Sequence, residues 1–323
     1  MLNWNFVARI AVAGVVALSA GAACGQDFPS KTIRIVAASV GSSGDFAARL
    51  TAQALSANVG QPVIVENRPG RVVIPVEIVM KSPADGYTLL LHGSSIWLLP
   101  YLRNDVTYDP VRDLAPVTIA SAAPNILVLH PSVPAKNVKE LIALARANPG
   151  VLNYSSTSIG GSSHLAAELF KSMAKVNIVR VPYRSGAQET ADLIAGQIQL
   201  AFGSASALTP HIKTGKLRGV AVTTAKPSVL IPGLPTIAAS GLPGYEAVSI
   251  LGIFAPAKTP SAVINRLHQE IARAINQPDI KEKFHTAGVE IGGDTPAQFG
   301  ALVKSEMAKW SKLFKEAGIR DES

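Results

Sequence analysis

The sequence has 323 residues, of which 48% are hydrophobic and 16% are charged. This length suits two domains, and the apolar content can fill sizeable cores, which excludes intrinsic disorder. A single cysteine excludes a disulfide scaffold. No apolar run of about 18 or more residues follows the N-terminal region, which excludes a bundle of membrane-spanning helices.

The chain carries 30 Lys and Arg against 22 Asp and Glu, for a formal net charge of +8. The basic residues are scattered, and neither a run of four nor a nucleic-acid-binding motif is present. We therefore interpret the excess as a solvated basic surface that attracts small anions weakly, and not as a nucleic-acid interface.

The first 25 residues have the pattern of a secretory signal peptide. Arg9 precedes an apolar run at residues 10–18, and small residues follow at 19–23. We expect cleavage after Gly25, which removes the only cysteine and leaves an exported, thiol-free protein. Attachment of a lipid at Cys24 is the alternative, although the preceding Gly-Ala-Ala lacks the Leu usual at such sites.

Short β-branched runs alternate with longer segments of helical periodicity in the rest of the chain. This alternation predicts an α/β protein with mixed sheets covered by helices on both faces. Strands are expected at residues 32–37, 62–65, 87–91, 117–130, 152–155, 177–181, 199–202, 219–222 and 249–254. Helices are expected at residues 45–59, 137–148, 164–175, 186–195, 208–214, 261–276, 279–287 and 295–317.

Two of the expected strands, 117–130 and 249–254, are nearly continuous apolar runs, and Pro124-Asn125 lies in the middle of the first. We interpret them as crossing strands that leave one core and enter another. They divide the chain into lobe 1, residues 26–124 plus 247–323, and lobe 2, residues 125–246. Ligands of such sheets bind beyond the carboxyl ends of the strands, which here places the site in the cleft between the lobes.

Four strand-to-helix loops rich in Gly and Ser are candidates for the binding site: residues 39–45, 93–95, 155–163 and 183–186. Each offers small hydroxyls and the backbone N–H groups of a helix N-terminus, where the helix dipole favours an anion. One such loop is weak evidence, because Ser and Gly commonly cap helices. Four loops around one cleft predict a site that holds a carboxylate or phosphate by neutral donors.

Enzyme motifs are absent from the sequence. It contains no G-x-S-x-G, P-loop or dinucleotide-binding pattern, and no H-x-x-x-H or C-x-x-C pair. We therefore expect no cofactor and no metal. Ser162 and Ser163 beside His164 leave a periplasmic serine hydrolase as an alternative, but we favour helix-capping serines and a histidine near the cleft.

Ordered motifs over nearly the whole mature chain resemble one known family. They are residues 28–31 (FPSK), 61–70 (QPVIVENRPG), 85–90 (DGYTLL), 108–110 (YDP), 153–155 (NYS), 161–166 (GSSHLA), 181–184 (VPYR), 210–218 (PHIKTGKLR), 241–246 (GLPGYE) and 254–260 (FAPAKTP). By these motifs the chain resembles the substrate-binding proteins of tripartite tricarboxylate transporters, the Bug-type receptors.

The resemblance implies a monomeric, two-lobed periplasmic binding protein of the Venus-flytrap, type II-like fold, without catalytic activity. Its ligand would be a small organic acid. Its partner would be a membrane permease with a large and a small subunit, or alternatively a two-component sensor kinase. The expected ligand-binding residues are Gly41, Ser42, Ser43, Asp45, Ser94, Ser95, Ser158, Gly161, Ser162, Ser163, His164, Tyr183, Ser185 and Ser204.

The chain departs from the family in the loop after the first strand, which is commonly P-F-x-P-G-G-x-x-D. Gly41 and Asp45 keep their places, whereas Ala37, Ala38 and Ser42 replace the first Pro, the Phe and the second Gly. A small residue in place of Phe is expected to enlarge or reshape the pocket.

Three further positions bear on the ligand. Arg71 follows the N-R-P-G motif, where it would either pair with a second ligand carboxylate or lie on the surface. Gly203 stands where many members carry an Asp that selects an amino group, which argues against amino-acid ligands. Trp97 would either form a pocket wall or belong to the core.

Overall fold

The computed structural model describes residues 28–38, 40, 42–183 and 185–320. The expected signal peptide, Cys24 and Gly41 lie outside these residues. The strands are β1 (Ile33–Ala37), β2 (Val63–Asn67), β3 (Thr88–Gly93), β4 (Leu114–Leu129), β5 (Asn153–Ser156), β6 (Val179–Pro182), β7 (Leu200–Ser204), β8 (Arg218–Val222), β9 (Val248–Pro256) and β10 (Glu290–Ile291). The helices are α2 (Ser43–Val59), α3 (Val73–Met80), α4 (Ser95–Leu102), α5 (Val138–Ala147), α6 (Ser162–Ala174), α7 (Gly186–Ile194), α8 (Ala205–Lys213), α9 (Ser261–Ile275), α10 (Pro278–Thr286) and α11 (Pro296–Ala317).

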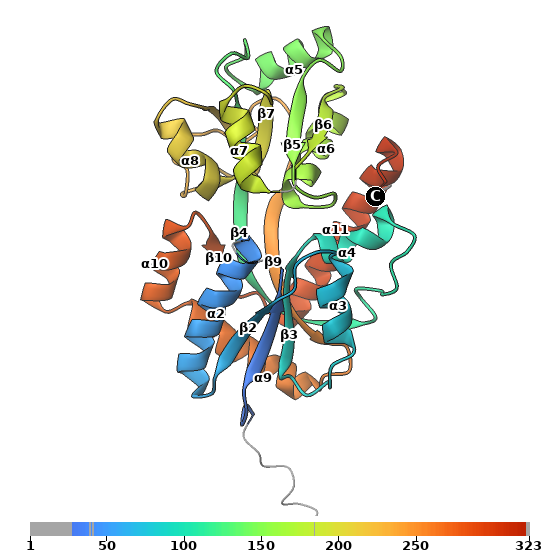
Figure 1. Ribbon diagram of the computed structural model, residues 1–323, viewed down its shortest axis with the longest axis vertical. Coiled ribbons are helices and arrows are strands. Elements are labelled where there is room, and N and C mark those ends of the chain that lie inside the picture. The colour runs from blue at the N-terminus through green and yellow to red at the C-terminus, as the bar shows by residue number, and fades with distance from the viewer. Residues whose placement is uncertain (1–27, 39, 41, 184, 321–323) are drawn as a thin grey trace, which may run out of the picture.

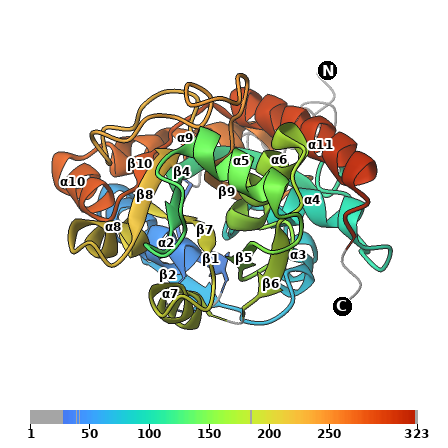
Figure 2. The same ribbon diagram turned by 90° about the horizontal axis from the view of Figure 1, so that it is seen from above.

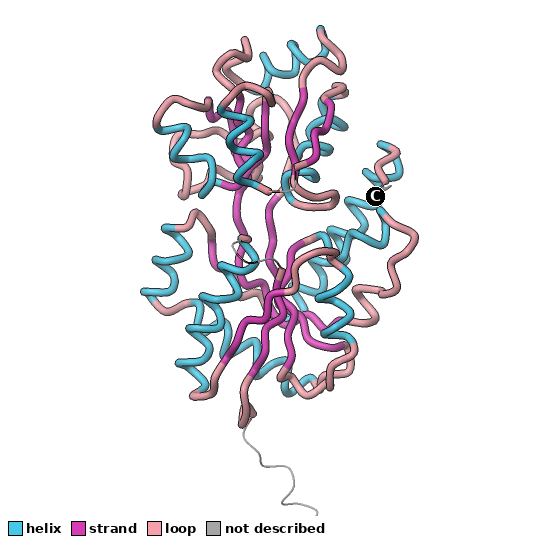
Figure 3. Tube along the Cα trace, in the orientation of Figure 1, coloured by secondary structure: helices cyan, strands magenta, loops and turns pink. Residues whose placement is uncertain are grey.

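Two long strands, β4 and β9, connect an upper and a lower lobe (Figures 1 and 3). Residues Leu114 to Pro124 of β4 pair antiparallel with β9, and residues Asn125 to Leu129 pair with β7 and β8. The prediction of two crossing strands is therefore confirmed. The limits of the lobes at 124/125 and 246/247 stay a prediction.

Parallel strands in both lobes end at the space between them. In lobe 1, β2, β1 and β3 are parallel, and β9 joins β3 antiparallel. In lobe 2, β7, β5 and β6 are parallel. The whole sheet has the order β2-β1-β3-β9-β4-β7-β5-β6, with β8 and β10 also paired to β4. The carboxyl ends of β1, β3, β5, β6 and β7 each lead into a helix that starts beside the cleft, as expected for a sheet of this kind.

Alternating side chains place helices on both faces of each sheet. In β1, Ile33 and Ile35 belong to a core shared with α2, α9 and α10, whereas Val36 packs in the core of α3, α4 and α11. The second of these cores continues into lobe 2 with α5 and α6, and a third core lies under α7 and α8. Seen from above, α5 and α6 lie on the α11 side of the molecule and α7 lies opposite (Figure 2). The helices that carry the cleft loops are thus fixed by buried apolar contacts.

Every predicted helix and strand is present, with ends shifted by a few residues, but α3, α4 and β10 were not predicted. Residues Ser95–Leu102 of α4 contain Pro100 and are apolar on nearly every side. A segment that is apolar on all sides shows no amphipathic periodicity, so its sequence pattern did not predict a helix. Burial among neighbouring elements stabilises this helix instead. Among the described residues, no helix combines the length and hydropathy needed to cross a bilayer.

Candidate ligand-binding site

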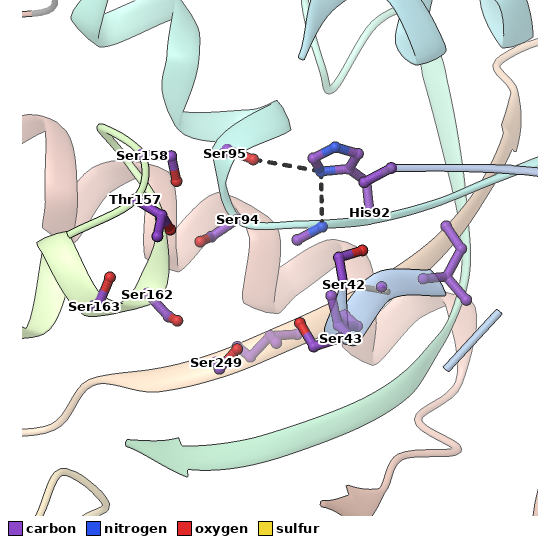
Figure 4. A pocket seen from close by; sticks show the side chains of 17 residues that line it. Ser42, Ser43, His92, Ser94, Ser95, Thr157, Ser158, Ser162, Ser163 and Ser249 are labelled. Carbon is purple, nitrogen blue, oxygen red and sulfur yellow. Dashed lines mark hydrogen bonds between the residues drawn. The ribbon is translucent and has the colours of Figure 1, made fainter. Parts of the chain in front are cut away.

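A cleft of 870 Å³ lies between the lobes and extends into a recess of 210 Å³ that shares most of its lining residues. The recess is lined mainly by hydroxyls (Figure 4). These come from the starts of α2, α4 and α6, from the loop after β5, and from β9. They belong to Ser42, Ser43, Ser94, Ser95, Thr157, Ser158, Ser162, Ser163 and Ser249. None of the described residues that line the recess is Asp, Glu, Lys or Arg.

The N-termini of five helices line the cleft. Their first residues or caps are Ser42 and Ser43 of α2, Ser95 of α4, Ser162 of α6, Gly186 of α7, and Ser204 of α8. Each terminus carries unpaired backbone N–H groups and about half a positive charge. These helix termini are suited to an anion, although no Lys or Arg is among the described residues that line the cleft.

Hydrogen bonds fix the recess loops. Ser42 caps α2 by accepting a hydrogen bond from the backbone N–H of Asp45 at 3.1 Å. The Ser94 hydroxyl donates to the carbonyl oxygen of Gly160 at 3.4 Å, which joins the α4 loop of lobe 1 to the α6 loop of lobe 2. The donors around the recess are consequently preorganised, and a ligand pays less of the ordering entropy on binding.

His92 lines the recess as a neutral imidazole. Desolvation lowers the pKa of its ring to about 4. Its Nδ1 atom accepts a hydrogen bond from the backbone N–H of Gly93 at 2.9 Å and lies 3.4 Å from the Ser95 hydroxyl (Figure 4). Because Nδ1 is an acceptor, the proton of the neutral ring is on Nε2. His92 therefore brings no charge to the recess at neutral pH.

Glu189 is the single residue with a formal charge among the described residues that line the cleft. It lies in the first turn of α7 and is half-buried. Its carboxylate accepts a hydrogen bond from the hydroxyl of Ser155 at 2.8 Å. Burial nevertheless raises the pKa of Glu189, against the opposing effect of this hydrogen bond.

Most of the predicted site residues come together in the cleft. Ten of the fourteen line it or its recess: Ser42, Ser43, Ser94, Ser95, Ser158, Gly161, Ser162, Ser163, Ser185 and Ser204. Three others, Asp45, His164 and Tyr183, are not among the lining residues: Asp45 and His164 are buried, and Tyr183 is half-buried with its hydroxyl bonded to Asp192. The lining also includes Ala38, which replaces the family's Phe.

Asp45 supports the recess from behind. Asp45 is 4% exposed. Its carboxylate accepts a hydrogen bond from Asn67 Nδ2 at 2.8 Å and forms an ion pair with Arg49 Nε at 2.9 Å. Asn67 Nδ2 also donates to the carbonyl oxygen of Ala38 at 2.7 Å. These contacts give Asp45 and Asn67 a positioning role toward Ala38 and the start of α2, and direct contact of Asp45 with a ligand stays a prediction.

Replacing Asp45 by Ala is expected to lower the affinity for the ligand about five- to twentyfold, because the loop loses its tether. Circular dichroism is expected to show a folded protein, and titration calorimetry measures the affinity. Asp45→Asn keeps an oxygen that accepts from Asn67 and is expected to lose less affinity than Asp45→Ala. An unchanged affinity in Asp45→Ala would contradict the positioning role.

His164 is buried and Tyr183 is half-buried, and each makes a hydrogen bond within lobe 2. The backbone N–H of Gly160 donates to Nδ1 of His164 at 3.2 Å, and the His164 side chain is buried. The Tyr183 hydroxyl donates to Asp192 at 2.8 Å, and burial together with this carboxylate raises its pKa to about 12. Binding of a ligand by His164 and Tyr183 stays a prediction, since both side chains are engaged in these contacts.

The structure also decides between the alternatives for Arg71 and Trp97. Arg71 forms an exposed ion pair with Asp105 at 2.6 Å, outside the lining of the cleft. Trp97 is 1% exposed and packs against Phe254 and Phe299 in the core, with ring centroids 6.0 and 6.3 Å away. Gly203 does line the cleft.

Several lining residues were not predicted from the sequence. They are His92, Ser121, Asn125, Glu189, Ser249 and Leu251. Pro124-Asn125 in the middle of an apolar run was the one local signal among them. The others lie on strands or within helices, where their position in the cleft depends on register and packing.

Comparison with known proteins agrees with this architecture. Residues 47–319 match the family model described as tripartite tricarboxylate transporter family receptor. Protein BugT of Bordetella pertussis is 31% identical over 323 residues, 98% of this chain and 99% of BugT.

Two solved structures from Rhodopseudomonas palustris are similar over most of the chain. One, determined with adipate, is 36% identical with a TM-score of 0.82 and covers 91% of this chain and 99% of its own. The other, MatC with bound malate, is 25% identical with a TM-score of 0.76 and covers 88% of this chain and 99% of its own. The family model matches most of the chain, and both BugT and the structure determined with adipate are more than 30% identical to it over nearly its whole length. The chain therefore belongs to the receptor family of the tripartite tricarboxylate transporters.

Proposed function

We propose that this protein is a periplasmic receptor that captures a small organic acid in the interlobe cleft and delivers it to a tripartite tricarboxylate-type membrane permease. The observation that carries the proposal is the recess in which hydroxyls and the N-termini of α2, α4 and α6 converge without a cationic side chain among the described residues. Such a site holds an anion by neutral donors and helix dipoles.

The chemistry of the recess suits a carboxylate. Each of its oxygens can accept two hydrogen bonds, and the recess offers clustered O–H and N–H donors. Hydrogen bonds to a charged acceptor contribute about 1.5–3 kcal/mol each once water is excluded. Similar proteins determined with adipate and malate support an organic acid as the ligand class.

Binding and closure are coupled in this mechanism. The recess combines Ser42 and Ser95 of lobe 1 with Ser162 of lobe 2, so a carboxylate contacts all three only when the lobes are close. An acid therefore favours the closed arrangement by its differential contacts, and the permease recognises that arrangement. Uptake of the bound acid by cells with and without the gene distinguishes delivery to a permease from presentation to a sensor kinase.

The proposal is tested by a thermal-shift screen of the protein against mono-, di- and tricarboxylic acids, aromatic acids and acidic amino acids. A ligand at a hundredfold excess over its Kd stabilises the folded protein by about 2.7 kcal/mol. A saturable shift with one class of acid, confirmed by calorimetry, is expected. The absence of binding by every acid would contradict the proposed ligand class and would direct the screen to neutral solutes.

The serine-hydrolase alternative gains no support from the geometry. Ser162 and Ser163 line the cleft, but the described lining residues do not include His164, whose Nδ1 accepts from Gly160. Ester turnover that Ser163→Ala abolishes would reverse this assignment.

Glu189 predicts how affinity depends on pH. Burial raises the pKa of this carboxyl above the ordinary value of 4.5, so a neutral form persists to a higher pH. As the pH rises through that pKa, Glu189 gains a negative charge in the cleft and repels an anionic ligand. Affinity for an organic acid is therefore expected to fall as the pH rises.

Glu189→Gln removes this charge and keeps an oxygen for the Ser155 hydroxyl. It is expected to flatten the pH profile measured by calorimetry and to raise affinity at neutral pH about three- to tenfold. Glu282→Gln, an exposed acid outside the cleft lining, is the matched control and is expected to leave the profile unchanged. A steep profile that survives Glu189→Gln would show that another group is responsible.

A further inference from the structure

The two lobes share an apolar core on the side of α11. This core contains Trp310 and Phe314 of α11 together with Phe170 of α6, so it continues from one lobe into the other. The hydrogen bond from Ser94 to Gly160 joins the α4 and α6 loops on the same side. Among the described residues, the core under α2, α9 and α10 belongs to lobe 1 alone, and the core under α7 and α8 belongs to lobe 2 alone. Separating the lobes on the side of α8 and α10 therefore exposes less apolar surface than separating them beside α11.

A glycine forms a contact between the lobes on this second side. Helix α8 of lobe 2 and helix α10 of lobe 1 lie on the same side of the molecule, opposite α11 (Figures 1 and 2). Gly288, in the turn between α10 and β10, faces the start of α8. A β-carbon added at Gly288 would lie 3.1 Å from the backbone nitrogen of Ser206 and 3.5 Å from Cβ of Ala205. Both Gly288 and Ser206 line the cleft, so this contact borders the ligand cavity.

Gly288 also has a local role at the end of α10. Its φ of +71° is left-handed, and its N–H donates to the carbonyl oxygen of His285 at 2.9 Å. Gly60 ends α2 in the same conformation, with a φ of +68°, but a β-carbon added there would meet no other described segment within 4 Å. Gly288 thus differs from an ordinary helix C-cap because the backbone of the other lobe packs against it.

We propose that Gly288 is a positioning residue for ligand binding, and that its contact with the start of α8 is the gate at which the lobes separate to admit the ligand. The inference rests on the proposed function, because it assumes that a ligand enters the interlobe cleft. Lobes that rotate about their shared core beside α11 move apart most at the edge formed by α8 and α10. A side chain at position 288 holds this edge apart, so the recess loops of the two lobes no longer contact one carboxylate together.

Gly288→Asn tests the contact and keeps the turn, because Asn is tolerated in the left-handed conformation. The probe is adipate, or the acid with the largest thermal shift if adipate does not bind. Calorimetry is expected to show affinity about tenfold lower than in the wild type, because the closed arrangement is less populated. Small-angle X-ray scattering is expected to show a larger radius of gyration for the variant with the acid present.

Gly60→Asn is the matched control, since it places the same side chain at a left-handed helix end away from the other lobe. It is expected to change thermal stability to a similar extent and to keep the affinity and the radius of gyration of the wild type. A general cost of Asn at such helix ends would affect both variants alike. An effect on affinity and shape in Gly288→Asn alone comes from the contact between the lobes.

A pair of cysteines tests the movement directly. The β-carbon positions of residues 288 and 205 are 3.5 Å apart, which a disulfide can span. In Gly288→Cys combined with Ala205→Cys, oxidation after loading with the acid is expected to slow its release at least about tenfold, because release requires the gate to open. Reduction with dithiothreitol is expected to restore fast release. The reduced pair controls for the strain of Cys at residue 288, and each cysteine alone controls for other thiol pairing.

The outcomes separate the gate from the proposed function. Unchanged affinity and radius of gyration in Gly288→Asn would overturn the gate alone. Release of the acid that oxidation does not slow would do the same, as would the absence of the disulfide by mass spectrometry. Failure of the wild type to bind any carboxylic acid would instead overturn the proposed function on which the inference rests.

Discussion

Replacing Ser162 by Asp is expected to weaken binding of an organic acid at least about a hundredfold, which corresponds to about 2.7 kcal/mol. Ser162 is the first residue of α6 and lines both the recess and the wider cleft. A carboxylate there repels the ligand at close range, and at about 4 Å and an effective dielectric of 20 this repulsion reaches about 4 kcal/mol. Titration calorimetry with the acid found in the screen measures the loss.

The same substitution separates binding from folding. An acidic residue in the first turn of a helix interacts favourably with the helix dipole and stabilises it by about 0.3–1 kcal/mol. Ser162→Asp is therefore expected to retain or increase thermal stability in the absence of ligand while affinity falls. A variant that binds as tightly as the wild type would show that the ligand does not approach the N-terminus of α6.

Ser261→Asp provides the matched control. Ser261 is the first residue of α9, as Ser162 is of α6, but it is exposed and does not line the cleft. We expect this substitution to change stability in the same direction and to leave affinity unchanged. A loss of affinity in both variants would point to a general effect of negative charge and not to the recess.

Replacing Trp97 by Ala is expected to lower the free energy of unfolding by about 3–5 kcal/mol. Trp97 belongs to α4, the helix whose N-terminus lines the recess. It is 1% exposed and packs against Phe254 and Phe299. The cavity left by the indole removes contacts that hold this helix against the sheet. Urea unfolding followed by fluorescence and circular dichroism measures the change.

The stability effects of the two buried indole N–H groups, those of Trp97 and Trp310, can be compared. Nε1 of Trp97 has no hydrogen-bond partner in the described chain, whereas Nε1 of Trp310 donates to the Glu306 carboxylate at 2.5 Å. Both tryptophans are 1% exposed. Phe at position 97 removes an unpaired buried donor, whereas Phe at position 310 breaks a charge-assisted hydrogen bond.

We therefore expect Trp310→Phe to destabilise the protein by about 1 kcal/mol more than Trp97→Phe. Equal m-values for the two variants would confirm that the difference arises in the folded state. If Trp97→Phe is the more damaging substitution, the fit of the indole to its cavity outweighs the cost of its unpaired N–H.

Local signals were sufficient for most of the framework. In α5, which was expected to begin at residue 137, Asn137 caps the helix by accepting a hydrogen bond from the backbone N–H of Glu140 at 2.9 Å. The helix expected at residues 295–317 begins with a capping box, in which Thr295 and Gln298 are bonded reciprocally. The two crossing strands were predicted because strands buried on both faces are continuously apolar. Local signals failed for α3 and α4, which are apolar all round and owe their helical state to burial between neighbours.

Local sequence signals likewise located only part of the binding site. Its serine-rich loops could be located from the sequence because several strand-to-helix junctions rich in Gly and Ser occur together in one chain, and helix N-termini of this kind are suited to an anion. The role of Asp45 could not, because it depends on Asn67, which the pairing of β1 with β2 brings beside it from 22 positions along the chain. Glu189 is part of the cleft lining for a comparable reason, since the packing of α7 over β5 brings it to Ser155.

By itself the sequence determined the α/β class, the crossing strands, the serine-rich loops and the family resemblance. These features depend on local periodicity, capping and turn chemistry, which act over a few residues. Only the tertiary structure decided that Trp97 is buried, that Arg71 is on the surface, and that Glu189 lines the cleft. Those assignments depend on strand register and lobe packing, which arise from contacts between residues far apart in the chain.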